Sequence, residues 1–363
     1  STPLIKSTGG QQTISGAING AQALTITSTD NLTLSGTIGA TAPPTSVSVT
    51  TTGSGVLALN ANVSTSGTQD YTAAGNITIN ADRTLTGTTI TTNSALSGAY
   101  ALAISGNAIF GDGTGTDTIT LSGTSKNLSV SGTTTLKADI TTSGTQTYTG
   151  AVTLSGGDRT LTGSTITNSS TIAGGTNSLA ITGASVINGA ISGVNIFSVS
   201  GTTSLGADVT TSGTQSYTGA VTVNGAARTL TTTGDNVTFT STVNSDSGGA
   251  RNLTIATGTA ATVQFNGTVG NTYPLGAIAI TGTNASLDLN AAITSATSLS
   301  VSGPSDLGAN VTTTGNSQTY SGPVTLSANT ILMDAGNILF SSTVDGAYTL
   351  TTSNSGANIT FTG

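Results

Sequence analysis

Short stretches of this chain alternate strictly between apolar residues and Thr or Ser. Examples are Leu-Thr-Ile-Thr at 24–27, Ile-Thr-Leu-Ser at 119–122 and Val-Thr-Phe-Thr at 237–240. A period of two places successive side chains on opposite faces of a β-strand, so each stretch predicts a strand with one buried and one solvated face. These stretches recur at intervals of roughly 8–12 residues with Gly or Asn between them, as in all-β proteins. We therefore predict an all-β fold.

A longer pattern is superimposed on the alternation. The stretch SVSGTTSLGADVTTSGTQSYTGAVTV at 198–223 returns almost letter for letter at 129–154, in a more diverged form from 300, and in a looser form at 48–79. Repeat units therefore begin near residues 48, 129, 198 and 300. Their Gln-X-Tyr markers are 77, 69 and 103 residues apart. Such unequal spacing, which we interpret as insertions of strand-sized pieces, suits a stack of coils better than a closed barrel or a sandwich. We predict that residues 1–363 form a single continuous β-solenoid segment of a larger chain.

Composition supports this fold and limits the function. Charged residues are 6% of the chain, all 14 acidic residues are Asp, and aromatic residues are 4%. Without Glu, and with few Lys, the chain lacks several of the best helix formers, whereas Thr, Val and Ile favour strands. A mean hydropathy of +0.16 and the regular alternation argue against disorder. A narrow solenoid core of Val, Ile, Leu and Ala needs few large rings.

Charge and hydropathy bear on partners and location. The net charge of -7 provides no basic face, so we expect no nucleic-acid partner. No apolar run approaches the roughly 18 residues of a membrane helix, and no signal peptide begins at Ser1. The absence of Cys fits an extracellular bacterial protein but is also compatible with the cytoplasm. Because the sequence opens and closes in mid-pattern, we expect a piece of a longer protein whose export signal lies outside this segment.

The stretch SGTQTYTGAVTL at 143–154, followed by a Gly/Asp turn and RTLTG, resembles the repeat region of filamentous-haemagglutinin-like exoproteins. These are large bacterial surface adhesins secreted by two-partner or autotransporter-type routes. The resemblance covers roughly residues 48–363 as a style of repeat; the family's secretion domain with its Asn-Pro-Asn motifs is not visible, since no Asn-Pro pair occurs. It implies a right-handed parallel β-helix, a location outside the bacterial cell or at its surface, and a role as a stalk or adhesive fibre.

The most conspicuous polar and aromatic positions are the repeat markers. They are Gln69, Tyr71, Gln146, Tyr148, Gln215, Tyr217, Gln318 and Tyr320. Exposed, the rings could stack on sugars along a fibre. We favour a structural role, in which each Tyr packs at a corner of the coil and Gln satisfies backbone groups there, because aromatic residues with a polar tip commonly serve in this way.

Three Arg residues occupy equivalent places in the repeats, namely Arg83, Arg159 and Arg228, and Asp precedes the first two. A polysaccharide lyase on a β-helix would need such a base beside a cluster of carboxylates. Here the acids are isolated, and Ala227 replaces the acid in the third copy. We predict turn residues with local charge pairs, which add little stability when exposed.

No residue set indicates an active site. The Gly-rich stretch 111–117, with Asp112 and Asp117, suggests calcium but lacks the nonapeptide period of calcium-binding repeats, so we interpret it as a loop. The absence of His and Cys removes the ligands that transition metals prefer, and a Ser nucleophile would have no His partner. We expect no catalytic, cofactor or metal site. Asn-X-Ser/Thr sequons such as Asn31, Asn76, Asn236 and Asn252 are expected by chance in a chain so rich in Thr.

We therefore expect a structural or adhesive stalk that self-associates laterally or end to end, with a surface glycan or a host or cell receptor as a further partner. One alternative is a carbohydrate-binding or ice-binding solenoid, because Thr-X-Thr arrays such as Thr84-Leu85-Thr86 resemble ice-binding faces. Such a face needs arrays in register on successive coils, and we expect the unequal spacing to break that register. A second alternative is a polysaccharide-degrading β-helix enzyme, which would require an acidic cleft beside Lys or Arg.

Overall fold

The computed structural model describes residues 3–114, 117–354 and 358–363. Every regular element among them is a β-strand, and none forms a helix that could cross a membrane. The chain divides into two compact units, Ser1–Asn177 (unit 1) and Ser178–Gly363 (unit 2). In each unit the chain runs repeatedly through three strand segments, which make one rung. Corresponding segments of successive rungs pair into three faces.

Unit 1 has faces 1a, 1b and 1c. Face 1a contains β1 (Leu4–Ser7), β3 (Leu24–Ser28), β5 (Val47–Thr51), β8 (Thr68–Ala73), the second halves of β10 (Arg83–Thr92) and β12 (Leu102–Phe110), β15 (Thr134–Leu136), β18 (Val152–Leu154) and β20 (Ile172–Ala173). Face 1b contains β2 (Gln12–Ile14), β4 (Leu32–Leu34), β6 (Leu57–Leu59), β9 (Ile77–Ile79), β11 (Leu96–Gly98), β13 (Thr118–Leu121), β16 (Asp139–Thr142) and the first half of β19 (Arg159–Asn168). Face 1c contains bridges at Ile18 and Ile38, β7 (Val63–Ser64), the first halves of β10 and β12, β14 (Leu128–Val130), β17 (Gln146–Tyr148) and the second half of β19.

Unit 2 has faces 2a, 2b and 2c. Face 2a contains β22 (Ile191–Val194), β25 (Val209–Thr211), β28 (Arg228–Thr231), β31 (Leu253–Ala256), β33 (Leu275–Thr281), the second half of β35 (Ile293–Val301), β38 (Ser317–Tyr320), β41 (Asn337–Phe340) and β44 (Ile359–Phe361). Face 2b contains the first half of β21 (Leu179–Ile187), β23 (Phe197–Val199), β26 (Gln215–Tyr217), β29 (Val237–Phe239), β32 (Thr262–Phe265), β34 (Ser286–Leu289), β36 (Ser305–Leu307), β39 (Val324–Leu326) and β42 (Val344–Asp345). Face 2c contains the second half of β21, β24 (Thr203–Leu205), β27 (Val221–Val223), β30 (Val243–Ser245), a bridge at Val269, the first half of β35, β37 (Val311–Thr313), β40 (Thr330–Asp334) and β43 (Leu350–Asn354).

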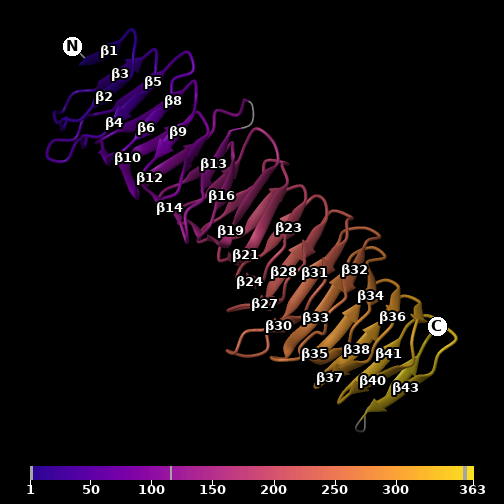
Figure 1. Cartoon of the computed structure of the whole chain (residues 1–363). Coiled ribbons are helices and arrows are strands. Elements are labelled where there is room, and N and C mark those ends of the chain that lie inside the picture. Colours follow the sequence, from indigo (N-terminus) through magenta and orange to yellow (C-terminus); the bar gives the residue numbers. More distant parts are fainter. Residues whose placement is uncertain (1–2, 115–116, 355–357) are drawn as a thin grey trace. The chain divides into compact units, whose positions relative to one another are not determined.

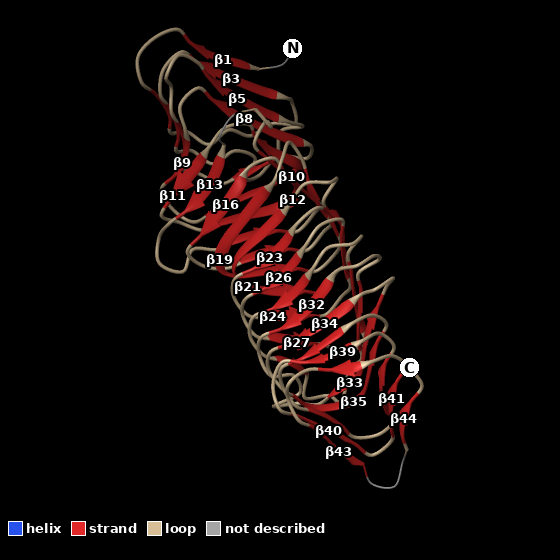
Figure 2. Ribbon diagram, turned by 90° about the vertical axis from the view of Figure 1, so that its right-hand side faces the viewer, coloured by secondary structure: helices blue, strands red, loops and turns tan. Residues whose placement is uncertain are grey.

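Neighbouring strands on each face run parallel, as β3, β5 and β8 do in Figures 1 and 2. Partners in register lie 18 residues apart where the connections are short, as between Leu128 and Gln146, and 26 where they are long, as between Leu102 and Leu128. Parallel strands joined by connections of this length form a coil rather than a hairpin. The predicted all-β, parallel β-solenoid fold is therefore confirmed. One continuous solenoid over the whole chain stays a prediction.

The core lies between the three faces and follows from the alternation. Strands such as β4 and β9 bury their first and third residues and leave the middle residue partly exposed. In unit 2 the inward column of face 2b also contains four aromatic rings in sequence, from Phe197 and Tyr217 to Phe239 and Phe265. The successive ring centroids are 6.0, 5.3 and 5.0 Å apart, and the last two contacts are stacked. Aromatic residues are therefore few, but they stack inside the coil.

Asn side chains at the corners connect one rung to the next. Asn31 Oδ1 accepts the backbone N–H of Val56 at 2.8 Å, and Asn236 Oδ1 accepts that of Thr262 at the same distance. Both Asn residues directly precede a strand that begins with an apolar residue followed by Thr. The sequons at these positions therefore arise from a corner amide followed by strand alternation, and their carboxamides are already engaged.

The sequence repeat does not coincide with the rung. From Tyr71 on β8 to Tyr148 on β17 the chain passes eleven further strand segments, which is two-thirds of a rung more than three rungs. From Tyr217 on β26 to Tyr320 on β38 it passes fourteen, counting the bridge at Val269. The longer interval thus contains one whole additional rung, and the interpretation as strand-sized insertions is wrong for this pair. Only an insertion of a complete rung preserves the pairing of every later segment.

Candidate functional site

The four repeat-marker tyrosines lie in the core. Tyr71, Tyr217 and Tyr320 are 0% exposed and Tyr148 is 1% exposed. Burial raises the pKa of each phenol well above its usual range. In unit 1 the markers occupy faces 1a and 1c, and in unit 2 they occupy faces 2b and 2a. No surface row of marker rings exists in either unit for a sugar to stack on.

Each marker Gln forms a buried clamp with its Tyr. In the first copy Tyr71 Oη donates to Gln69 Oε1 at 2.8 Å. Gln69 Nε2 donates to the carbonyl oxygens of Val63 at 3.2 Å and Thr86 at 2.7 Å. Val63 belongs to the preceding strand, and Thr86 lies one rung further along the same face. One amide therefore joins a corner of the coil to the adjacent rung.

The other three copies repeat this geometry. The carbonyl acceptors of Gln146, Gln215 and Gln318 are those of Ile140 and Thr162, of Val209 and Thr231, and of Val311 and Met333. In each copy the Tyr hydroxyl donates to its own Gln at 2.8–3.1 Å. Buried polar atoms that form such bonds avoid the cost of an unsatisfied group. The repeated motif is therefore absorbed by the corner of the solenoid.

The prediction of local Arg–Asp pairs is wrong. Arg228 Nε and Nη2 both donate to the backbone carbonyl of Asn224, at 3.1 and 2.8 Å, and Arg159 donates in the same way to Ser155. Arg83 donates to Asn80 Oδ1, while the adjacent Asp82 forms its ion pair with Lys126 at 3.4 Å. The guanidinium folds back over its own turn because the strand-end carbonyls there lack other donors.

The loop that contains Asp112 and Asp117 satisfies its own polar groups. Asp112 accepts the backbone N–H and the hydroxyl of Thr114, and Asp117 accepts the backbone N–H of Asp112. The N–H of Thr114 holds the pKa of Asp112 below its usual value, and burial raises that of Asp117. Residues 115 and 116 of this loop lie outside the described residues. Among the residues that are described, no group of three or more acidic side chains is placed to hold a metal ion.

A row of hydroxyl side chains runs along the outside of face 1b, contrary to the expectation that unequal spacing breaks the register. Its members are paired directly on eight successive rungs, and we name them the face-1b row: Thr13, Thr33, Ala58, Thr78, Ser97, Thr120, Thr141 and Thr162. The register survives because the differences in length are taken up at the corners. The row places hydroxyl and methyl groups at the strand spacing of about 4.8 Å.

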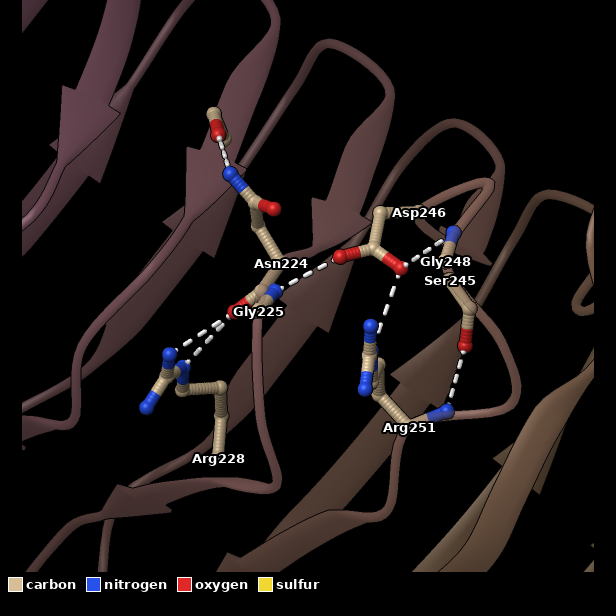
Figure 3. Close-up of polar contacts among 8 residues, drawn as sticks. Asn224, Gly225, Arg228, Ser245, Asp246, Gly248 and Arg251 are labelled. Atoms are coloured by element: carbon tan, nitrogen blue, oxygen red, sulfur yellow. Dashed lines mark hydrogen bonds and ion pairs between the residues drawn. The ribbon is translucent and has the colours of Figure 1, made fainter.

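The most elaborate polar arrangement of unit 2 surrounds Asp246, just after β30. One carboxylate oxygen accepts the N–H of Gly225 at 2.7 Å, and the other accepts the N–H of Gly248 at 3.0 Å and Arg251 Nε at 3.1 Å. Figure 3 shows Asp246 between the Gly225 backbone and the Arg251 side chain. The Gly225 N–H, followed by Arg251 and the Gly248 N–H, holds the pKa of Asp246 below its usual value. The carboxylate is therefore fixed in position and ionised.

A hollow of about 420 Å³ lies beside this carboxylate on the outside of face 2c. We name it the Tyr273 groove, and its lining residues are Thr222, Asn224, Asn244, Ser245, Asp246, Ser247, Thr272 and Tyr273. The Tyr273 side chain is 44% exposed, unlike the marker tyrosines. Asp246 is the single carboxylate among the lining residues. Glycoside hydrolysis normally uses two, so the groove is better suited to binding than to that chemistry.

The sequence contained weak signals for this groove. Arg251 is a fourth Arg at a strand entry, and Tyr273-Pro274 is an aromatic residue in a loop, outside the alternation. Neither signal indicated that Tyr273 lies beside Asn244, because that contact depends on the register of two rungs. The comparison with known proteins adds no further guide: no family model, no curated protein and no solved structure matches this chain.

Proposed function

We propose that this chain is a mechanical spacer, without catalysis, in a fibre outside the cell or at its surface. The observation that carries the proposal is the fate of the repeated motif. All four Gln–Tyr pairs are buried and join adjacent rungs, so the most strongly repeated residues serve the cohesion of the coil. A repeat used in this way favours extension of a structure over recognition of a ligand.

The bonding pattern supports a load-bearing role. Backbone hydrogen bonds on every face run from one rung to the next, and the Gln side chains add bonds in the same direction at the corners. Each rung therefore depends chiefly on its two neighbours. Tension would remove rungs one after another and leave the remainder paired.

Single-molecule force spectroscopy of the full chain, held by its two ends, tests this role. Each step should release one rung of 18–26 residues, or roughly 60–90 Å at about 3.4 Å per residue. Smooth extension of the kind shown by an unstructured polymer would refute the proposal.

Deletion of residues 287–304 provides a matched control. Because Leu287 pairs with Ser305, this deletion of 18 residues removes one rung and retains the register of the rest. It should remove one step and leave the remaining steps unchanged. Deletion of 287–295 removes only part of a rung and should abolish the regular steps that follow, because it moves later strands to the wrong face.

The location and the lateral association belong to the same proposal. The resemblance to secreted repeat adhesins supports an extracellular bacterial location. Antibodies against the chain should label intact source cells as strongly as permeabilised ones, and labelling only after permeabilisation would refute it. The face-1b row supports lateral contact, since Thr side chains pair well across strands. Sedimentation velocity should then show concentration-dependent association that Thr78→Lys weakens.

The face-1b row also favours a second candidate function, the binding of ice. Regular hydroxyl and methyl groups on eight rungs could order water in a lattice. Thermal hysteresis of a solution of the chain tests this function. Thr78→Lys should abolish it, whereas Thr147→Lys, on the outside of face 1c, should not. The absence of hysteresis in the parent chain would eliminate this candidate.

A further inference from the structure

We infer that the Tyr273 groove of unit 2 binds a neutral saccharide. This role goes beyond the spacer function and does not depend on it. The inference rests on three features of the groove: an exposed ring on a fixed loop, a set of polar groups with unused bonding capacity, and the sign of its charge.

The ring is held in place by its own backbone. The N–H groups of Thr272 and Tyr273 both donate to Asn244 Oδ1, at 2.9 and 3.4 Å, and the Tyr273 carbonyl accepts the N–H of Ser245 at 3.3 Å. Pro274 follows directly and restricts the Tyr273 backbone to extended conformations. A ligand that uses this ring therefore orders little additional chain, which reduces the entropic cost of binding.

The ring offers a face that suits the C–H side of a pyranose. The face of an aromatic ring is electronegative, and the axial C–H groups of a sugar carry a small positive charge, so the two attract when stacked. The phenol adds a hydroxyl that donates or accepts. With 44% of Tyr273 exposed, this surface has no partner in unit 2 large enough to cover it.

The polar lining has the mixed donors and acceptors that sugar hydroxyls require. Asn244 Oδ1 is used by the loop, which leaves its Nδ2 group as a donor toward the groove. Asn224 Nδ2 donates to Ser204 Oγ at 3.1 Å, which leaves Asn224 Oδ1 as an acceptor (Figure 3). The Asp246 carboxylate uses three of about four acceptor positions within the protein and retains one. Vicinal hydroxyls of a sugar can bond to a donor and an acceptor side by side.

The charge decides between neutral and acidic sugars. Asp246 is ionised, no cationic side chain lines the groove, and the whole chain carries a net charge of -7. The field of the protein therefore repels uronic acids and sulfated sugars. The groove is suited to an uncharged hexose chain.

Isothermal titration calorimetry and saturation-transfer NMR of the full chain test the inference. The probes are maltotetraose, cellotetraose and mannotetraose, with trigalacturonate as the acidic comparator. We expect at least one neutral probe to bind and the acidic one to bind at least tenfold more weakly. Tyr273→Ala should weaken binding at least tenfold, and Tyr273→Phe should keep it within about threefold because the ring remains. Tyr348→Ala removes another exposed Tyr of unit 2, outside the groove, and should leave binding unchanged.

The opposite results would overturn the inference. It fails if none of the three neutral probes binds at millimolar concentration, or if trigalacturonate binds more tightly than they do. Equal weakening by Tyr348→Ala and Tyr273→Ala would place the binding outside the groove. Circular dichroism of each variant verifies that the solenoid is intact, so loss of binding through unfolding is recognised. Failure of binding leaves the force measurements of the spacer untouched.

Discussion

Replacing Tyr217 with Phe removes one hydroxyl from the core of unit 2 and leaves the aromatic ring in place. The ring should stay between Phe197 and Phe239, with centroids 6.0 and 5.3 Å away. The hydroxyl donates to Gln215 Oε1 at 3.0 Å, so the substitution leaves that buried oxygen without its donor. An unsatisfied buried acceptor costs about 1–3 kcal/mol, and we expect a loss of about 1–2 kcal/mol because the hydroxyl itself no longer requires a partner.

Replacing Gln215 with Leu should cost more. The Tyr217 hydroxyl loses its acceptor, and the carbonyls of Val209 and Thr231 lose the Nε2 donor. Counting the hydroxyl and the Thr231 carbonyl as unsatisfied gives about 2–4 kcal/mol. The double variant removes both partners of the Tyr–Gln bond, so its loss should fall short of the sum by about 1 kcal/mol or more.

Hydrogen exchange measured by mass spectrometry on the full chain is the appropriate assay, because a solenoid need not unfold in one step. Peptides covering β23, β26 and β29 should lose protection by the amounts given, while peptides from unit 1 should not change. Ser216→Ala, on the outward side of β26, is the matched control and should stay within about 0.5 kcal/mol of the parent. If both Tyr217→Phe and Gln215→Leu match this control, the clamp does not stabilise the solenoid and the central argument for a structural repeat is lost.

Three further predictions concern backbone geometry and ionisation. Gly106→Ala should destabilise unit 1 by roughly 2 kcal/mol or more, since φ is +144° and a Cβ would overlap the Gly87 carbonyl, whereas Gly157→Ala, with φ of +126° and open space, should cost only about 1 kcal/mol; thermal melting compares the two. In alkaline titration at 295 nm, four of the seven tyrosines should stay protonated well above pH 10 while the fold persists, and the stability that their burial provides is full below pH 10 and lost as pH rises toward the folded-state pKa; seven tyrosinates in the folded chain near pH 10 would contradict this. The depressed pKa of Asp246 contributes stability that is present above pH about 4 and lost as pH falls below it, so Asp246→Asn should remove this acid sensitivity from the peptides around Arg251, as followed by hydrogen exchange.

The sequence allowed the fold to be predicted because its signals are local. Alternation over three to five residues determines which side chains of a strand such as Leu32–Leu34 face inward, and corner residues such as Asn31 determine where the strand begins. Stacking such strands leaves few arrangements that bury every apolar face. The parallel solenoid was therefore accessible without knowledge of any long-range contact.

The site was less accessible because it depends on register. The side chain beside Tyr273 is determined by the lengths of the connections in two rungs, and these lengths vary between 18 and 26 residues. The same uncertainty produced the wrong expectation for the face-1b row, whose Thr side chains align in spite of unequal spacing. The wrong Arg–Asp pairs have a different cause: a guanidinium near unpaired strand-end carbonyls, as at Asn224, gains more from them than from an exposed carboxylate.

The offset between repeat and rung limits where recognition can reside. Within each unit, successive Gln–Tyr markers are separated by a whole number of rungs plus two segments, so a repeated residue appears on a different face in each copy. A receptor that approaches one side of a unit would therefore meet only one copy of any repeated side chain. Selection for a regular binding surface could not maintain such a repeat, but selection for a clamp inside the coil could, because every corner needs one. Recognition should then depend on residues that depart from the repeat, and Tyr273, in a loop outside the alternation, is such a residue.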